Sequence, residues 1–399
     1  MTKGEVSGPL KGLRVIEMGQ LIAGPFCGQM FADMGADVIK IEPPGRGEPM
    51  RVWGRDGYPL WWSVVARGKR CITADLKTEE GQNIVRSLVA NADFVLENFR
   101  PGTLEKWKLA YEDLKAIKPD IIMIRVSGYG QTGPYSARPG YASVGEAMGG
   151  LRYLMGEPDR KPSRAGVSLG DTLAGTFATI GALAALRHRD QTGEGQVVDA
   201  SIYESVLALT EALVPEYMIE NKTRERSGSI LPDVAPSNIY DGKDGMVIIA
   251  ANQDTVFARL CEAIGKPELK DDPRFHDHSA RGANQVELDD LIGDWTRQRT
   301  IAEIETHMIA HAVPVGKVYR AKEMLDDPHY EARKSLVEIA SERWGSVTMP
   351  NVTPKLSATP GNVRWSGPET LGEHTDEVLS ELAGLTAEEI AALREKNVI

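Results

Sequence analysis

The sequence predicts an α/β fold, with a Rossmann-like large domain built on a parallel sheet and a smaller α/β domain after it. Two observations lead to this prediction. Short apolar strand patterns alternate with amphipathic helix patterns in the first part of the chain, an order typical of parallel sheets with helices on their faces. The chain of 399 residues is also longer than one hydrophobic core usually supports, so two domains are expected.

The first elements form two strand–helix–strand patterns. A strand, a helix with proline in its first turn and a second strand are predicted at Leu13–Glu17, Gly24–Met34 and Asp37–Glu42. The same order follows at Cys71–Leu76, Glu79–Asn91 and Ala92–Phe99, and a further strand is predicted at Ile121–Gly130.

The second half of the chain changes character twice. From Asp171 to Arg187 nearly all residues are small or apolar, which predicts a helix that its neighbours approach closely. Residues 220–237 are polar and poor in helix signals. The predicted division is a large domain over residues 1–219, a linker over 220–237, a small domain over 238–335 and a C-terminal return to the large domain over 336–399.

Charge and cysteine usage exclude several classes of protein. Lys and Arg number 46 against 57 Asp and Glu, a net charge of −11, so no nucleic-acid partner is expected. Cys27, Cys71 and Cys261 form no CxxC pair and no cluster with histidine, so neither a disulfide framework nor a metal site is predicted. The chain opens without a secretory pattern and has no run of 18 apolar residues. We therefore expect a cytoplasmic protein with no membrane partner.

The common nucleotide and hydrolase motifs do not occur. The first strand–helix turn, Gly19–Phe26, reads GQLIAGPF and lacks the GxGxxG pattern that brings a backbone close to a pyrophosphate. The sequence has no P-loop, no HExxH and no GxSxG. NAD binding, phosphoryl transfer, zinc-dependent hydrolysis and α/β-hydrolase chemistry therefore have no motif to support them.

Asp171 is the candidate catalytic residue, and local sequence leaves two interpretations of it open. It follows Gly170 at the start of the small-residue helix, so it fits an N-cap, whose carboxylate accepts a backbone N–H. The same position suits a nucleophile, because a helix N-terminus favours an ionised carboxylate and Gly170 leaves room for a reactive carbonyl. A carboxylate that attacks a thioester forms a mixed anhydride, a known kind of covalent catalysis.

A resemblance that extends over most of the chain favours the second interpretation. The segments that carry it, in order, are Ala23–Glu48, Arg67–Gly81, Glu97–Trp107, Ser127–Tyr135, Gly170–Leu186, Thr192–Ser205, Asp244–Asp254, Ala312–Tyr319, Leu356–Gly361 and Leu371–Thr375. In these segments the chain resembles the family III CoA-transferases, the group of formyl-CoA transferase and carnitine CoA-transferase. Together the segments cover roughly residues 10–382.

The resemblance implies a mechanism and a substrate. The catalytic aspartate of the family falls on Asp171, on which an aspartyl-acyl anhydride and then an aspartyl-CoA thioester would form. Coenzyme A thioesters and small carboxylic acids are the implied substrates, and no permanently bound cofactor is implied. The implied CoA-binding residues are Ile22, Ala23, Arg67, Ala74, Asp75, Leu76, Lys77, Asn98, Phe99, Arg100, Lys106 and Tyr141. Several are basic, as phosphate groups require in an acidic protein, and Lys69 and Arg70 lie among them in sequence.

The chain departs from the formyl-CoA and oxalate pattern at two places. Members with that specificity carry a Tyr-Glu pair before the nucleophile, whereas Tyr141 is followed here by Ala142. Their glycine-rich loop also has no equivalent, because residues 226–238 hold a single glycine. A succinyl-CoA donor with a dicarboxylate acceptor is therefore the favoured prediction.

Two other functions are weighed against CoA transfer. A 2-methylacyl-CoA racemase shares the resemblance but needs two bases, and Tyr141 stands where that group has a histidine. A non-catalytic CoA-binding protein would have lost the nucleophile, and Asp171 is present. The resemblance further implies an interlocked homodimer, in which each chain is threaded through a ring formed by the other.

Overall fold

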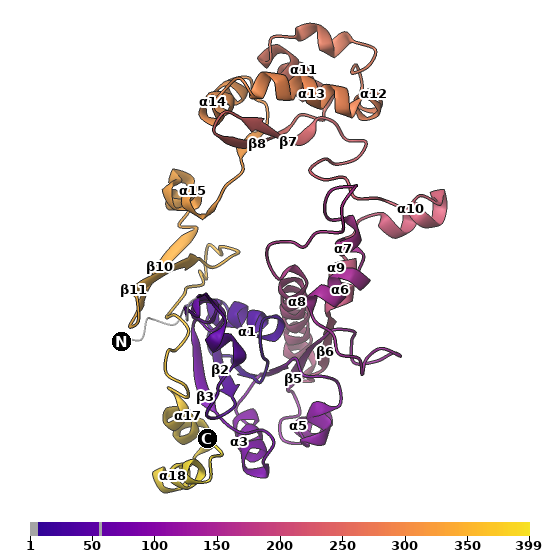
Figure 1. Cartoon of the computed structure of the whole chain (residues 1–399). Coiled ribbons are helices and arrows are strands. Elements are labelled where there is room, and N and C mark those ends of the chain that lie inside the picture. Colours follow the sequence, from indigo (N-terminus) through magenta and orange to yellow (C-terminus); the bar gives the residue numbers. More distant parts are fainter. Residues whose placement is uncertain (1–6, 56–57) are drawn as a thin grey trace. The chain divides into compact units, whose positions relative to one another are not determined.

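The computed structural model describes residues 7–55 and 58–399 (Figure 1). Residues 1–6 lie outside the described residues. The predicted large domain begins with them, and so does the N-terminal stretch in which the sequence shows no secretory pattern. The chain forms two compact units, which are described separately. Unit 1 comprises the residues up to Arg152, Ala165–Ala212 and His329–Ile399, and unit 2 comprises Tyr153–Arg164 and Leu213–Pro328.

Unit 1 is built on a six-stranded parallel sheet. Its strands are β1 (Arg14–Glu17), β2 (Asp37–Glu42), β3 (Lys69–Thr73), β4 (Phe94–Glu97), β5 (Ile122–Ser127) and β6 (Val197–Ser201), paired in the order β3-β2-β1-β4-β5-β6. Every neighbouring pair is parallel, so all strands end at the same edge of the sheet. This is the Rossmann strand order, and the predicted α/β fold is confirmed.

Helices cover both faces of the sheet, because alternate strand residues point to opposite sides. Ile16 and Val95 face a core completed by α3 (Glu79–Val89), α17 (Thr375–Ala383) and α18 (Ala387–Glu395). Val15 and Phe94 face the opposite core, which α1 (Ala23–Asp33) and α8 (Leu169–Thr192) complete. The C-terminal helices therefore belong to the same layer as α3.

The small residues of α8 permit a close helix pair, as the sequence predicts. Ala174, Ala178 and Ala182 lie one turn apart and are buried against α1 and the sheet. A Cβ on Gly175 would stand 2.8 Å from the carbonyl oxygen of Ala23 in α1. No larger residue would fit between these two backbones.

Among the described residues, α8 is also the one helix that is long and apolar enough to cross a membrane. Length and composition alone are weak grounds for a membrane span, since core helices of globular domains have the same properties. Here the alanine face of α8 packs on α1.

Shorter elements complete unit 1. The helices are the 3₁₀ helix η1 (Pro49–Val52), α2 (Leu60–Val65), α4 (Thr103–Lys106), α5 (Tyr111–Lys115), α6 (Ala142–Met148) and α9 (Ile202–Leu207). The helix α7 (Leu151–Leu154) begins in unit 1 and ends in unit 2. The returning chain forms an antiparallel hairpin of β10 (Leu336–Ser341) and β11 (Gly345–Pro350). His374 also belongs to this return, and its Nδ1 accepts the Cys71 N–H at 3.2 Å, so it helps to dock α17 on β3.

Unit 2 packs helices against a three-stranded antiparallel sheet. The strands are β7 (Ser237–Gly242), β8 (Gly245–Ala250) and β9 (Val315–Lys317), in the order β7-β8-β9. The helices are α10 (Leu213–Glu220), α11 (Asp254–Ala263), η2 (Pro267–Asp271), α12 (His278–Ala283), α13 (Gln285–Thr296), α14 (Ile301–Ala310) and α15 (Ala321–Asp326). The helix α16 (Pro328–Ala332) begins at the last residue of unit 2 and continues in unit 1. The core of unit 2 includes Phe257 and Leu288, and the buried Arg281 donates to the Ala235, Asn252 and Phe275 carbonyls.

The compact units differ in their limits from the predicted domains. Residues 221–236 form no helix or strand, as expected of the predicted linker, but they belong to unit 2 together with α10. Unit 2 also takes residues 153–164, and the return to unit 1 begins at His329 rather than at residue 336. Sequence patterns locate elements, whereas these limits depend on which distant segments pack together.

Candidate active site

The loops that follow β1 and β4 meet at the carboxyl edge of the sheet. Asn98, the first residue after β4, accepts the Gln20 N–H with Oδ1 at 2.7 Å and donates Nδ2 to the Gln20 carbonyl at 2.8 Å. The strand order reverses between β1 and β4, and ligands of such sheets bind in the crevice at this reversal. The predicted CoA residues Ile22, Ala23 and Asn98 therefore lie where the fold favours a ligand.

A buried set of charges supports the turn before α1. Leu21 has a φ of 61°, a left-handed conformation that a leucine rarely adopts. Glu48 accepts the Leu21 N–H at 2.8 Å and lies 3.0 Å from the Lys40 ammonium, which also donates to the Gly19 carbonyl. Burial alone would lower the pKa of Lys40, but the Glu48 and Glu17 carboxylates outweigh it and raise that pKa. Lys40 therefore stays charged and fixes this turn.

Asp171 lies in the first turn of α8, near the same edge. It is the third residue of the helix, and Ser168 is the N-cap. The N-cap interpretation of Asp171 is therefore wrong, since the helix begins three residues earlier than an N-cap at 171 requires. The partial positive charge of a helix N-terminus still favours an ionised carboxylate in this turn.

Gly170 does not leave an open path to Asp171, in contrast to the sequence-based expectation. A Cβ there would meet Ile202 Cγ2 at 3.1 Å, the Ala142 carbonyl oxygen at 3.2 Å and Glu146 Cγ at 3.3 Å. The glycine therefore allows α6 and α9 to pack tightly against α8.

Packing brings several predicted residues to the neighbourhood of Asp171. Gly175, one turn further along α8, touches the Ala23 carbonyl at the start of α1. Tyr141 is the N-cap of α6, the helix that also contacts Gly170, and it is 68% exposed. Ala23 at the start of α1 and Tyr141 at the start of α6 therefore belong to two helices that both pack on α8, the helix of Asp171.

The segment Ala74–Lys77 follows β3 at the same edge. The Ala74 N–H donates to the Glu42 carbonyl at 2.9 Å, and the Asp75 N–H donates to the Val398 carbonyl at 2.8 Å. The Asp75 side chain accepts the Lys77 N–H at 3.1 Å, and Leu76 is buried in the core under α3. Backbone bonds to both β2 and the C-terminus thus fix this segment.

The segment Asn98–Arg100 follows β4, and contacts of Glu97 and Phe99 hold it in place. Glu97 accepts the Phe99 N–H at 2.8 Å and binds Arg125 at 2.7 Å. Burial raises the pKa of Glu97 to about 7, although the Arg125 guanidinium opposes this change. The Phe99 ring packs on Trp107 with 5.2 Å between ring centroids.

The predicted basic residues fall into two groups. The side chains of Lys77, Arg100 and Lys106 are exposed, and none forms an ion pair with another described residue. They are available to a phosphate-bearing ligand. Lys69 and Arg70, in contrast, are buried and paired, Lys69 with Glu17 at 2.7 Å and Arg70 with Asp37 at 2.6 Å.

The expectation for Arg67 also needs correction. Its guanidinium is 3% exposed and binds both carboxylate oxygens of Asp33, at 2.9 and 2.6 Å. Its remaining nitrogen donates to the Pro350 carbonyl at 2.5 Å, which ties the β10–β11 hairpin to α1. Arg67 therefore supports the fold and has no nitrogen left for a phosphate.

Sequence reasoning missed three residues near the site: Glu48, Glu146 and Arg152. Glu146, on α6, accepts the Gly170 N–H at 3.2 Å and is paired with Arg152. A single charged residue in the otherwise small and apolar helix Ala142–Met148 was the available signal. Glu48 had no comparable signal, because its partner Leu21 adopts its unusual backbone only in the folded chain.

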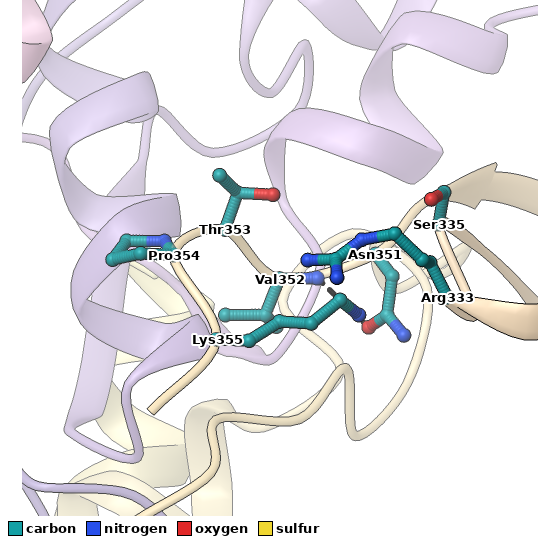
Figure 2. Close-up of a pocket in the computed structure, with 7 residues that line it drawn as sticks. All are labelled: Arg333, Ser335, Asn351, Val352, Thr353, Pro354 and Lys355. Atoms are coloured by element: carbon teal, nitrogen blue, oxygen red, sulfur yellow. Dashed lines mark hydrogen bonds between the residues drawn. The ribbon is translucent and has the colours of Figure 1, made fainter. Parts of the chain in front are cut away.

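A separate cavity lies in the return segment of unit 1 (Figure 2). Its volume is about 310 Å³. Arg333, Ser335, Asn351, Val352, Thr353, Pro354 and Lys355 line it. None of these is a predicted CoA residue. Among the described residues no group of three or more His, Cys, Asp or Glu side chains could hold a metal ion.

Comparisons with known proteins identify the family of the chain. A model of CoA-transferase family III matches residues 10–375. Two proteins of Chloroflexus aurantiacus are similar over 98% of both chains: succinyl-CoA–D-citramalate CoA-transferase at 55% identity over 395 residues, and the beta subunit of succinyl-CoA–L-malate CoA-transferase at 44% over 398. The crystal structure of a CAIB/BAIF family protein from Brucella suis superposes with a TM-score of 0.84 at 36% identity, covering 94% of this chain and 100% of that one.

Proposed function

The chain belongs to CoA-transferase family III and is a CoA-transferase, and we propose that it moves coenzyme A from succinyl-CoA to a small dicarboxylic acid through covalent intermediates on Asp171. The observation that carries this proposal is the 55% identity, over 98% of both chains, to a succinyl-CoA–D-citramalate CoA-transferase. Citramalate is accordingly the first acceptor to test.

The proposed reaction proceeds by two exchanges at Asp171. Its carboxylate oxygen attacks the thioester carbonyl, the C–S bond breaks, and an aspartyl-succinyl anhydride and CoA thiolate form. The thiolate then attacks the aspartyl carbonyl, which releases succinate and leaves an aspartyl-CoA thioester. The acceptor carboxylate repeats these steps in reverse, so Asp171 is regenerated and no proton or electron is gained or lost overall.

The described residues support distinct roles in this proposal. Asp171 lies in the first turn of α8, where the helix dipole favours a negatively charged carboxylate. The loops before α1 and after β4 receive the coenzyme at the strand reversal. The exposed cations Lys77, Arg100 and Lys106 bind its phosphates.

A homodimer is part of the proposal. Ile180, on the opposite side of α8 from its buried alanines, is exposed, as are Phe177 of the same helix and Leu207 and Leu209 around the end of α9. The exposed apolar surface of α8 is suited to a protein interface. We expect this surface to contact a second copy of the chain.

Isotope exchange tests the proposed chemistry. Labelled succinate should enter the succinyl-CoA pool, and citramalate should yield citramalyl-CoA, in the wild type but not in Asp171→Asn. Intact-protein mass spectrometry after a rapid quench should show an adduct of coenzyme A on the wild type alone. Full exchange by Asp171→Asn, or α-deuteration of 2-methylacyl-CoA without exchange, would refute the proposal, and the second result would favour a racemase.

A further inference from the structure

The start of α8 is capped by a residue of another helix. Ser168, at the N-cap position, makes no side-chain capping bond. Glu146 of α6 instead accepts the N–H of Gly170 at 3.2 Å. The first N–H groups of a helix lack partners within the helix, and here a carboxylate from a distant part of the sequence satisfies one of them directly before Asp171.

This carboxylate is held in one place. Glu146 is 1% exposed, and its second oxygen is paired with the Arg152 guanidinium. A buried carboxylate with both oxygens bound cannot change rotamer without losing a charged hydrogen bond. The position of Gly170 is therefore fixed by a clamped side chain.

The packing around Gly170 transmits this restraint to Asp171. A Cβ at Gly170 would already crowd Ile202, the Ala142 carbonyl and Glu146. The backbone consequently has little freedom toward α6 and α9. Asp171 is the next residue, so the direction in which its carboxylate leaves the helix depends on the same contacts.

We propose that Glu146, clamped by Arg152, is a positioning residue for Asp171. The inference rests on the proposed function, in which Asp171 is the nucleophile. Glu146 touches neither the thioester nor coenzyme A in this role. It sets the geometry of attack, and a displacement of about 1 Å at a nucleophile can slow a reaction by about 100-fold.

A purely structural cap would behave differently from a positioning residue. Loss of a structural cap lowers the melting temperature. It reduces turnover only in proportion to the amount of folded protein that is lost. Loss of a positioning residue lowers kcat in folded enzyme, with little change in the KM for acyl-CoA. The rate at which Asp171 is acylated separates the two cases.

Four variants test the inference. Glu146→Ala removes the acceptor of the Gly170 N–H. Glu146→Gln keeps an amide oxygen for this N–H, but its NH₂ group then faces the Arg152 guanidinium, so that two donors meet. The double variant Glu146→Gln with Arg152→Met removes the opposed Arg152 guanidinium and with it the unpaired charge. Thr179→Val is the matched control, because it removes a buried hydrogen bond of α8, from Thr179 to the Gly175 carbonyl, two turns beyond Asp171.

We expect Glu146→Ala to lower kcat about 100-fold, Glu146→Gln about tenfold, and the double variant to recover to within about threefold of the wild type. The KM for succinyl-CoA should change less than about threefold in each folded variant. Quenched single-turnover mass spectrometry should show acylation of Asp171 slowed in the same proportion. Thr179→Val should lose thermal stability but keep its kcat.

Two results would overturn the inference: wild-type kcat in folded Glu146→Ala, or a fall in kcat that follows melting temperature equally in Glu146→Ala and Thr179→Val. If Glu146→Ala does not fold, the comparison of Glu146→Gln with the double variant decides, and equal activities refute the inference. Asp171→Asn distinguishes a failure of the positioning role of Glu146 from a failure of the proposed function. An inactive Asp171→Asn beside a fully active Glu146→Ala refutes the positioning role alone.

Discussion

Arg67 and Lys106 are both predicted to bind phosphate, yet in the folded chain Arg67 is buried and Lys106 is exposed. Lys106 ends a short helix on the surface, with its ammonium exposed. Arg67 lies under the β10–β11 hairpin with every side-chain nitrogen bonded. A cationic side chain becomes a ligand contact only where tertiary packing leaves it without a carboxylate partner.

Alanine variants should separate these two roles. Lys106→Ala should raise the KM for succinyl-CoA about tenfold, more at low salt than at high salt, and leave the melting temperature unchanged, because an exposed ionic contact is lost. Arg67→Ala leaves Asp33 buried without its partner, so it should lower the free energy of unfolding by about 3 kcal/mol or more. Steady-state kinetics and urea unfolding measure both. An unchanged KM in Lys106→Ala would contradict the placement of CoA phosphates here.

At the scale of elements, the contact between α1 and α8 joins the proposed CoA-binding loop to the helix of Asp171, the proposed nucleophile. Gly175 allows this contact, since its missing Cβ would stand 2.8 Å from the Ala23 carbonyl. Gly181, further along the same helix, would meet only the Val198 side chain, at 2.7 Å, and a side chain can move aside more easily than backbone.

We therefore expect Gly175→Ala to be more damaging than Gly181→Ala. Gly175→Ala should lower the free energy of unfolding by about 1–3 kcal/mol, the usual effect of overpacking, and also raise the KM for acyl-CoA by displacing the start of α1. Gly181→Ala should change the free energy of unfolding and the KM for acyl-CoA by at most about half as much. Equal effects on KM from the two variants would show that the α1–α8 contact does not support the binding loop.

The amino ends of three strands are tied together by one carboxylate. Asp37 begins β2 and binds Arg14 of β1 at 2.9 Å and Arg70 of β3 at 2.6 Å. Burial would raise the pKa of Asp37, but hydrogen bonds and charges from Arg70 and Arg14 outweigh it and hold that pKa below its ordinary value of 3.8. Asp37 therefore stabilises the fold in its ionised form.

This arrangement predicts how stability depends on pH. Because the pKa of Asp37 is lower in the folded state, its contribution is present above the ordinary value of 3.8 and is lost as the pH falls through the folded-state pKa. Asp37→Asn should cost about 2 kcal/mol near pH 7 and clearly less in the acid range below the ordinary pKa. Urea unfolding at both pH values measures the difference, and a pH-independent loss would exclude this linkage.

At the scale of the whole molecule, a single chain leaves one apolar face of α8 exposed. Ile180 is 56% exposed on a helix whose other face lies in the core. A hydrophobic surface of this kind is buried when two copies associate.

Ile180→Asp should therefore weaken the proposed homodimer. We expect the wild type to elute with twice the mass of one chain in size-exclusion chromatography with light scattering, and the variant to dissociate at concentrations at least about tenfold higher. Ile117→Asp, at an exposed apolar residue far from α8 in sequence, is the control and should stay dimeric. A monomeric wild type, or equal dissociation of both variants, would contradict the expected interface.

The sequence by itself determined the order of the elements and the family. Asp37–Glu42 is a strand with the predicted limits, Asp171 lies in the first turn of the small-residue helix, and the ordered segments from Ala23 to Thr375 identify the family. Such features are local, since periodicity and spacing along the chain record them.

The tertiary structure decided what those residues can do. It placed Arg67 in a buried pair, filled the space beside Gly170, and gave α8 a cap from Glu146. Each outcome depends on which segments, distant in sequence, pack within hydrogen-bonding distance. A charged side chain looks the same in sequence whether it will meet solvent, a ligand or a buried partner, because that choice is made by the burial of its neighbours.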